Sequence, residues 1–296
     1  MKKSQNLKYN KIKGALYGFA IGDAMGATTE FMDNYTINKK FGVLKNIVGG
    51  GWLGLESGQV TDDTQMTLCV CEAIEYAHEY AQGKVNFEAH MLSRCCHNFI
   101  EWYLSNPPDI GCCCRTVISQ CQNKSYNDWF SIADDPESLG NGSLMRTMPI
   151  ILAGLSKETA ISQGRLTHNN KTCDCAIEIY YQNLEELLYH DTFMNTVAQI
   201  YEPTGHVFNT LNNSLYWVQH TDSLEEAIIK AVNHGGDADT IAAITGSLAG
   251  AYYGYDKIPQ RWVSQLSDNV KSDLDKYAKL FEKINKKYVQ NTNNIV

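Results

Sequence analysis

The sequence predicts a compact all-α protein, and three observations support this prediction. Apolar residues recur at helical spacing, at i, i+3, i+4 and i+7, along most of the chain. Only six prolines interrupt the 296 residues. No alternation of apolar and polar residues bounded by turn residues indicates a strand. Because no linker, low-complexity tract or long repeat divides the chain, we expect one domain over residues 1–296, with a core at about 12–266 and a C-terminal helix at about 268–288.

Composition and charge exclude several classes of protein. Hydrophobic residues make up 44% and charged residues 20% of the chain, which excludes disordered and fibrous proteins. The net charge of −8 disfavours nucleic acids and anionic membranes as partners, because both need a basic face. No segment holds the roughly 20 apolar residues of a membrane helix. The N-terminus lacks the apolar region and cleavage site of a secretion signal, so we expect a cytoplasmic protein.

Two series of glycines predict close contacts between helices. They are Gly14, Gly18, Gly22 and Gly26 near the start of the chain and Gly246, Gly250 and Gly254 near its end. On a helix, a glycine at every fourth position leaves a groove without side chains, where another backbone or a ligand can approach. We expect helix–helix packing at most of these positions. Around Gly22 and Gly26 a loop near a site is an equal alternative, because Asp23 interrupts the apolar face.

The first cluster of acidic residues lies at positions 58–64. Thr61 is suited to the N-cap of a helix that continues through residues 66–74, which places Asp62 and Asp63 in the first turn. There the free N–H groups and the helix dipole stabilise ionised carboxylates. A well-capped helix with no further role is the simpler alternative for these two aspartates alone.

Further helices are predicted in the middle and at the end of the chain. Apolar stripes run through residues 87–104, 173–188 and 270–288. Another stripe begins at Leu224, where Asp222 or Ser223 can cap the helix and Glu225 or Glu226 can complete a capping box. These segments support the all-α prediction.

A second acidic cluster, at residues 235–240, repeats the form of the first: glycine, then two aspartates and a threonine, then an apolar helix. If the two helix starts face each other, they bring together four carboxylates and two hydroxyls. That many like charges need cations between them. All-oxygen ligands select hard divalent metals, so we expect Mg²⁺ or Mn²⁺. The sequence therefore predicts a site with room for two metal ions.

The ten cysteines do not indicate a zinc site or a disulfide framework. No pair has the spacing Cys-x-x-Cys, and adjacent cysteines cannot easily point at one tetrahedral ion. We expect most of them to be reduced, small, buried apolar residues.

Four stretches of the chain resemble the motifs of the ADP-ribosylglycohydrolase family, in the same order and at similar spacing. They are residues 22–31 with Asp23 and Glu30, residues 61–64, residues 140–146 and residues 236–240. The resemblance extends from about residue 14 to about residue 266. Within the family, the chain is most similar to the bacterial glycohydrolases that activate dinitrogenase reductase, through residues 47–53 and its short length.

The resemblance implies an all-α fold with two Mg²⁺ or Mn²⁺ ions at the base of a cleft. The metal ligands that it implies are Thr61, Asp62, Asp63, Asp237, Asp239 and Thr240. Asp239 would bridge the two ions, and Glu30 would lie beside them. The family's reaction is hydrolysis of the bond between ADP-ribose and an acceptor side chain. In the most similar branch, the acceptor is an arginine guanidinium.

The residue types suit that chemistry. Cleavage of an N-glycosidic bond develops positive charge at the anomeric carbon, which carboxylates stabilise. Metal ions can hold ribose hydroxyls and activate water. Asp109 resembles an acidic residue that the family places over the reacting bond, so Asp109 and Glu30 are the expected acid/base pair, and Asp62 is a further catalytic candidate. The alternative for Asp109 is a turn aspartate after two prolines.

The resemblance also implies a set of substrate-binding residues. They are Gly111, Asn141, Gly142, Ser143, Met145 and His168. The backbone N–H groups of residues 141–143 would wrap the diphosphate, because glycine lets chain and ligand approach. His168 matches a position near the adenosine, with a satisfied histidine at a helix end as the alternative. Arg146 either steadies the loop or the acidic site, or forms a structural salt bridge.

Two departures from the branch lie on the substrate side. Cys112 replaces the usual asparagine, and Thr204 and Gly205 stand where a tyrosine is frequent. We expect a metal-dependent hydrolase that removes ADP-ribose from arginine on a protein, with dinitrogenase reductase as the expected partner. The alternatives are a hydrolase of another linkage, to serine or to a small molecule, and a non-catalytic module that binds ADP-ribose. We expect neither nucleic-acid binding nor membrane insertion.

Overall fold

The computed structural model describes residues 2–81, 86–190, 192–193 and 198–292. These residues form helices and turns without a β-strand, and isolated bridges join Gly50 to Leu55 and Gly140 to His206. The predicted all-α class is therefore confirmed. In chain order the helices are α1 (Lys2–Gly26), α2 (Asn34–Phe41), α3 (Asp62–Ala81), α4 (Phe87–Leu104), α5 (Cys112–Gln120), α6 (Tyr126–Ile132), α7 (Met148–Leu152), α8 (Lys157–Gly164), α9 (Lys171–Tyr189), α10 (Val207–Gln219), α11 (Leu224–His234), α12 (Ala238–Tyr253), α13 (Gln260–Gln265) and α14 (Asp268–Thr292), with 3₁₀ turns η1 (Asn141–Ser143) and η2 (Tyr255–Lys257).

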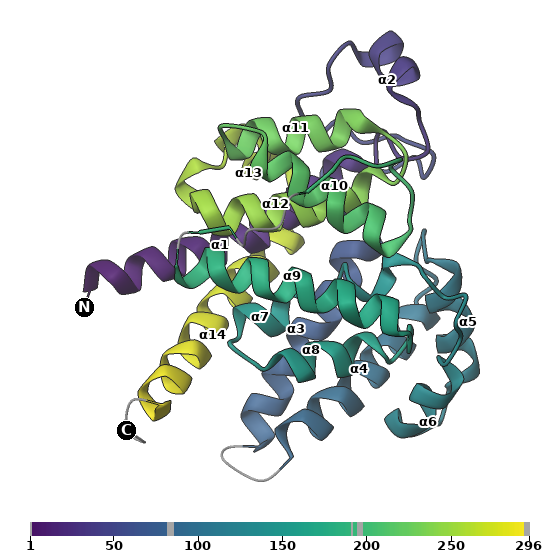
Figure 1. The fold of residues 1–296 in the computed structure, drawn as a ribbon, viewed down its shortest axis with the longest axis vertical. Coiled ribbons are helices and arrows are strands. Elements are labelled where there is room, and N and C mark those ends of the chain that lie inside the picture. Colours follow the sequence, from purple (N-terminus) through teal and green to yellow (C-terminus); the bar gives the residue numbers. More distant parts are fainter. Residues whose placement is uncertain (1, 82–85, 191, 194–197, 293–296) are drawn as a thin grey trace.

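Helices α1 and α12 lie at the centre of the molecule (Figure 1). They touch along their glycines. A Cβ atom added to Gly14 would lie 2.3 Å from the carbonyl oxygen of Gly250, and one added to Gly18 would lie 2.1 Å from that of Gly246. As the residue numbers rise along α1, the numbers of the residues they contact fall along α12, so the two helices are antiparallel. Only glycine allows two helix backbones to approach this closely.

The same seam continues through Gly22 and Gly26. A Cβ at Gly22 would lie 2.0 Å from the carbonyl oxygen of Ala242, and one at Gly26 would lie 2.4 Å from that of Ala238. Both glycines belong to α1, so the alternative of a loop at this point is wrong. The seam brings the C-terminal end of α1 next to the N-terminal end of α12.

The other helices cover this central pair. In the view of Figure 1, α10, α11 and α13 lie above α1 and α12, whereas α3, α4, α7 and α8 lie below them. The core between these layers contains fully buried side chains such as Phe19, Met66 and Ile244. α5 and α6 lie to the right, beyond α3 and α4, and α2 projects at the top.

The predicted amphipathic helices are present. α4 has the predicted bounds, and α9 and α14 contain the predicted stripes. Ser223 caps α11 by accepting a hydrogen bond from the backbone N–H of Glu226 at 3.1 Å. The side chain of Tyr288, at the end of the C-terminal stripe, lies outside the described residues. Among the described helices, none has both the length and the apolar character that crossing a membrane requires.

All ten cysteines have free thiols, and six of them are buried. Burial raises the pKa of the Cys121 thiol to about 11, which keeps it in the neutral form. The prediction that most cysteines are buried is confirmed, whereas their reduced state stays a prediction. Cys112 is an exception, because it is exposed at the start of α5.

Candidate active site

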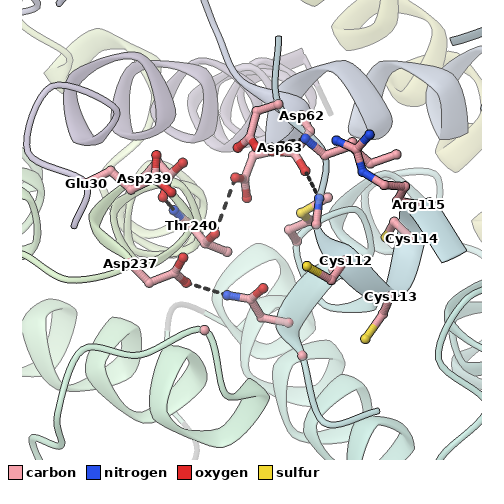
Figure 2. A pocket seen from close by; sticks show the side chains of 18 of the residues that line it. Glu30, Asp62, Asp63, Cys112, Cys113, Cys114, Arg115, Asp237, Asp239 and Thr240 are labelled. Atoms are coloured by element: carbon pink, nitrogen blue, oxygen red, sulfur yellow. Dashed lines mark hydrogen bonds between the residues drawn. The ribbon is translucent and has the colours of Figure 1, made fainter. Parts of the chain in front are cut away.

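The starts of α3 and α12 face the same cleft, which has a volume of about 590 Å³ (Figure 2). Six carboxylates line it: Glu30, Asp62, Asp63, Asp109, Asp237 and Asp239. Asp62 and Asp63 lie in the first turn of α3, and Asp239 lies in the first turn of α12. The predicted juxtaposition of two acidic helix starts is therefore present in the structure.

Asp63 joins the two helix starts directly. Its Oδ2 accepts hydrogen bonds from the hydroxyls of Thr61 and Thr240, each at 3.3 Å. Thr61 Oγ1 in turn accepts from the backbone N–H of Asp63, as the predicted N-cap would. Thr61 is fully buried and lies behind the residues that line the cleft.

Asp23 from α1 holds the start of α3 in place. Its carboxylate accepts hydrogen bonds from the backbone N–H groups of Thr61 and Thr64, both at 3.0 Å, and from the Thr64 hydroxyl. It thus satisfies N–H groups that a helix start leaves without intrahelical partners. This role was not predicted, although the aspartate interrupting an apolar helix face marked the position.

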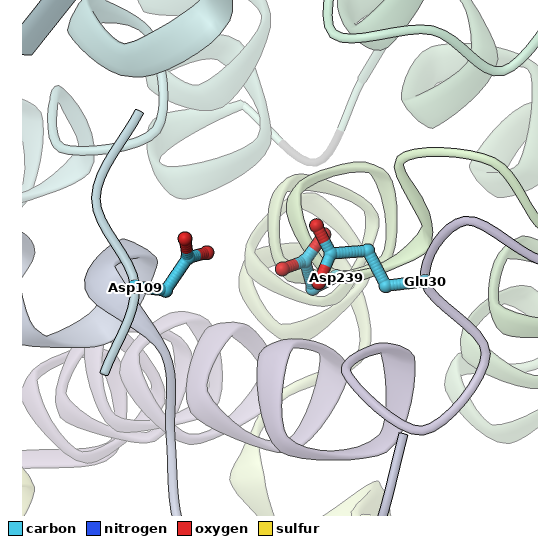
Figure 3. Close-up of side chains that lie close together, drawn as sticks. All are labelled: Glu30, Asp109 and Asp239. Carbon is cyan, nitrogen blue, oxygen red and sulfur yellow. The ribbon is translucent and has the colours of Figure 1, made fainter. Parts of the chain in front are cut away.

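Glu30, Asp109 and Asp239 form a second group at the cleft. Each offers a carboxylate oxygen, and these atoms lie within 4.8 Å of one another. Figure 3 shows Glu30 beside Asp239, with Asp109 opposite them. The loop that carries Asp109 contacts the first cluster, since the Gly111 N–H donates to Asp62 Oδ2 at 3.2 Å. Asp109 therefore faces the acidic cluster, and its Oδ1 also accepts a hydrogen bond from the Ile110 N–H at 2.8 Å.

Burial and mutual repulsion raise the pKa values of this cluster. Burial, followed by the charge of Asp109, raises the pKa of Asp62 to about 8. Burial likewise raises the pKa of Glu30 to about 8 and that of Asp237 to about 6. For Asp239, burial and then the charges of Glu30 and Asp63 raise the pKa well above its ordinary value. The cluster therefore favours protons or cations over free negative charge.

The donor set fits divalent metal ions. Asp63 Oδ1 is buried and has no hydrogen-bond partner among the described residues. A buried carboxylate oxygen without a partner is costly unless something positive meets it. The surrounding ligand atoms are all oxygens, which suits Mg²⁺ or Mn²⁺ rather than softer metals. The predicted ligands thus lie where a hard cation would relieve their repulsion.

The loop at residues 140–146 borders the same cleft. Asn141 Nδ2 donates to Asp237 Oδ2 at 2.5 Å, and its backbone N–H donates to the Gly205 carbonyl at 3.0 Å. That N–H group is already engaged, so the prediction that it contacts a diphosphate does not fit its geometry. Gly142 and Met145 line the cleft, whereas Ser143 is fully buried behind it.

Arg146 is fully buried beneath this loop. Its guanidinium donates to Gly142 O at 2.6 Å, to Gln163 Oε1 at 2.5 Å and to Thr167 Oγ1 at 2.8 Å. It also lies 4.8 Å from the ring centre of Phe99. None of these partners is a carboxylate, so the contacts are those of the loop-steadying alternative and not of a salt bridge.

His168 lines the cleft although it is almost completely buried. Its Nδ1 is 2.8 Å from Thr167 Oγ1. Burial and the nearby Arg146 charge lower the pKa of His168 to about 3, so the ring is neutral. The ring packs against Gly142, where a Cβ would lie 3.0 Å from His168 Cε1.

Nine further residues that line the cleft were not among the predicted site residues. They are Phe31, Trp52, Ile110, Cys112, Cys113, Cys114, Arg115, Gly140 and Gly205. Trp52 Nε1 donates to Glu30 Oε2 at 2.5 Å. Burial raises the pKa of Asp109, and the positive charge of Arg115 opposes part of this rise. Phe31 directly follows Glu30 in the sequence. Trp52 reaches the cleft on a separate loop, and Cys113 and Arg115 reach it on α5, so no spacing in the sequence connects these three to the acidic clusters.

Comparisons with known proteins point to one family. The model of the ADP-ribosylglycohydrolase family matches residues 4–182 and 177–290. The ADP-ribosyl-[dinitrogen reductase] glycohydrolase of Rhodospirillum rubrum is 31% identical, over 90% of this chain and 93% of its own. The ADP-ribosylarginine hydrolase Tri1 of Serratia proteamaculans is 30% identical, over 87% of this chain and 75% of its own. A solved structure, an ADP-ribosylglycohydrolase-related protein complex, has a TM-score of 0.78 and 26% identity, covering 94% of this chain and 99% of that one.

Proposed function

Because the chain belongs to the ADP-ribosylglycohydrolase family, we propose that it hydrolyses the bond between ADP-ribose and an arginine guanidinium on a modified protein. The observation that carries this proposal is the group formed by Glu30, Asp109 and Asp239, whose carboxylate oxygens lie within 4.8 Å of one another at the cleft. The names of two relatives add support, since both act on ADP-ribosylated substrates.

In this proposal the acidic helix starts hold two divalent cations, Mg²⁺ or Mn²⁺. The ligands would be Thr61, Asp62, Asp63, Asp237, Asp239 and Thr240. When bound, such ions supply Lewis-acid activation of water and hold ribose hydroxyls. Asp63 is suited to this role because one of its carboxylate oxygens is buried without a hydrogen-bond partner among the described residues.

The remaining carboxylates act on the glycosidic bond. Positive charge develops at the anomeric carbon as that bond breaks, and the negative side chains around the cleft stabilise it. We assign Asp109 and Glu30 as the acid/base pair, with one removing a proton from the attacking water and the other donating a proton to the departing guanidine nitrogen. Asp62 supports Asp109 through the hydrogen bond that it accepts from Gly111.

The substrate side of the cleft is formed by Gly111, Gly142, Met145 and His168. A neutral His168 can stack on or hydrogen-bond to the nucleoside without adding charge. Asn141 acts indirectly, because its amide orients Asp237. Ser143 supports the loop from behind.

The test is release of ADP-ribose from an arginine-ADP-ribosylated protein, with a serine-linked protein beside it. We expect release from the arginine linkage with Mn²⁺ or Mg²⁺ and none after EDTA treatment. Release from the serine linkage alone would contradict the proposed acceptor. Binding of ADP-ribose without release from either substrate would contradict hydrolysis and identify a binding module.

For the protein target we propose dinitrogenase reductase, on the strength of the 31% identity to the Rhodospirillum rubrum enzyme. Cys112 and Gly205 both line the cleft, at positions that depart from the pattern of that branch. The target is therefore tested separately, by adding the protein to ADP-ribosylated dinitrogenase reductase and measuring recovered reductase activity. Recovery at a rate similar to that on an unrelated arginine-modified protein would argue against a dedicated target.

A further inference from the structure

We propose that Trp52 is a positioning residue for the reaction, because its indole N–H holds the Glu30 carboxylate toward Asp109 and Asp239. The inference rests on the proposed function. Trp52 Nε1 donates to Glu30 Oε2 at 2.5 Å, across a separation of 22 residues. Glutamate has three rotatable side-chain bonds, so a carboxylate at its end needs a fixed partner if it is to stay in one place. Among the described residues, the Trp52 indole N–H is the side-chain donor to the Glu30 carboxylate.

The backbone beneath Glu30 is already fixed by the second acidic loop. The Phe31 N–H donates to the Gly236 carbonyl at 2.7 Å, and the Gly236 N–H donates to the Met32 carbonyl at 2.9 Å. Phe31 has a φ of 60°, in the left-handed region that non-glycine residues rarely adopt. These contacts hold the turn but do not touch the Glu30 carboxylate, which leaves its side-chain torsions to be set by Trp52.

The loop that carries Trp52 is built rigidly against the same turn. Gly50 and Leu55 exchange two backbone hydrogen bonds, at 2.7 and 3.0 Å, which close the loop. The Thr28 hydroxyl donates to the Gly49 carbonyl at 3.1 Å. A Cβ added to Gly51 would lie 2.0 Å from the Ala27 carbonyl oxygen, so the two backbones are in contact. The donor is therefore presented from a fixed backbone, as a positioning role requires.

The Trp52 ring lies beside the Glu30 carboxylate at the cleft. Glu30 is only 4% exposed, whereas Trp52 is 52% exposed at the lip of the cleft. Its ring packs on Phe31, with 5.4 Å between the ring centres. A ring at this place can either hold Glu30 through its N–H or contact the acceptor protein through its face, and two substitutions separate these roles.

The experiment compares Trp52→Phe, which keeps a ring but removes the donor, with Trp52→Gln, which keeps a donor but removes the ring. Both are assayed as the Mn²⁺-loaded enzyme on the arginine-linked substrate. We expect Trp52→Phe to lower kcat on the order of 10- to 100-fold with KM within about twofold of wild type. We expect Trp52→Gln to recover most of kcat.

Trp102→Phe is the matched control. Trp102 Nε1 also donates to a side-chain oxygen, Gln65 Oε1, at 2.7 Å, but Trp102 does not line the cleft. This variant should keep its kcat. Full kcat in Trp52→Phe would overturn the inference, and so would a change confined to KM in Trp52→Gln. If wild type itself releases no ADP-ribose, the proposed function fails instead, so the two failures are distinguishable.

Discussion

At the scale of single residues, Asp239 is a buried carboxyl group whose charged form the fold disfavours. It is 2% exposed, and burial together with the charges of Glu30 and Asp63 raises its pKa well above the ordinary value. Functional sites commonly hold such groups at a cost in stability. Without cations, the protein should therefore be less stable than a variant in which a carboxyl group of the acidic cluster is replaced by a neutral side chain.

Asp239→Asn tests whether this carboxyl group lowers the stability of the metal-free protein and is needed for Mn²⁺ binding. The amide has nearly the same shape but removes one buried charge, so the metal-free variant should be more stable by about 1 kcal/mol, or roughly 2–4 °C in Tm. It should also lose the Mn²⁺-induced rise in Tm and the hydrolase activity. Thermal scans with and without Mn²⁺ measure both effects. Asp134→Asn, at an exposed position outside the cleft, is the control. An unchanged response of Asp239→Asn to Mn²⁺ would remove Asp239 from the ligand set.

Arg146 supplies a second prediction, because its buried guanidinium is the anchor of the Gly142 loop. Arg146→Met should lower the free energy of unfolding by about 3 kcal/mol, since hydrogen bonds from a charged group are lost and their acceptors stay buried. Affinity for ADP-ribose should fall as well. Denaturant titration and calorimetry measure the two losses. Arg165→Met, which removes an exposed ion pair to Asp174, should cost at most about 1 kcal/mol. Equal losses in both variants would contradict the anchoring role.

Individual residues differ in how far the sequence predicts them. Asp62, Asp63, Asp237 and Asp239 follow from two local patterns of the same form, so their meeting at one cleft was predictable. Trp52 was not, because only the path of a glycine-containing loop brings it to Glu30. The burial of Ser143 behind the cleft was equally unpredictable, since a 3₁₀ turn sets which residues of its loop face outward.

At the scale of elements, the glycine seam determines where the two acidic helix starts stand. Gly18→Ala tests it. Alanine is the better helix former by about 1 kcal/mol, but its Cβ would lie 2.1 Å from the Gly246 carbonyl oxygen, which cannot move without displacing α12. We expect a net loss of at least about 3 kcal/mol, measured by denaturant unfolding.

Gly164→Ala is the comparison for that variant. Gly164 is also helical and buried, but its Cβ would meet the flexible end of the Ile177 side chain. Gly164→Ala should lower the free energy of unfolding clearly less than Gly18→Ala does. If the two substitutions lowered the free energy of unfolding equally, the backbone contact between α1 and α12 would not explain the effect of Gly18→Ala.

The helices themselves were largely predictable, because 3.6-residue periodicity and capping residues are local properties of the sequence. The capping serine of α11 is one example. The sequence did not decide whether Gly22 and Gly26 lie in a helix or in a loop, because a polar residue on an apolar face is compatible with both. The structure resolves it, because Asp23 is a cap for the distant start of α3.

At the scale of the whole molecule, the acidic cluster links stability, metal binding and pH. The pKa values of Asp237, Glu30 and Asp62 are raised to about 6, 8 and 8 in the folded protein. A raised carboxyl pKa adds stability that is complete at low pH and is lost as the pH rises through the folded value. The metal-free protein should therefore lose stability from about pH 4, where these carboxyl groups ionise in the unfolded chain, to about pH 8.5.

The same groups must release protons when a cation binds, so the rise in Tm caused by Mn²⁺ should grow over that range. Thermal scans at fixed Mn²⁺ concentration and several pH values measure this growth. Asp239→Asn provides the control, since it removes one of the carboxylates in the cluster. A constant rise in Tm across the pH range would show that the cluster does not exchange protons for metal.

The pairing of Gly18 with Gly246 also has a consequence for biosynthesis. Helix α1 packs against a helix that is synthesised more than 200 residues later. At synthesis rates of about 5–20 residues per second, α1 waits roughly 10–50 seconds for its partner. During that time its apolar faces and its bare glycine stripe have no native cover. We therefore expect nascent chains shorter than about 250 residues to depend on chaperones, and the catalytic cleft to be among the last parts of the molecule to form.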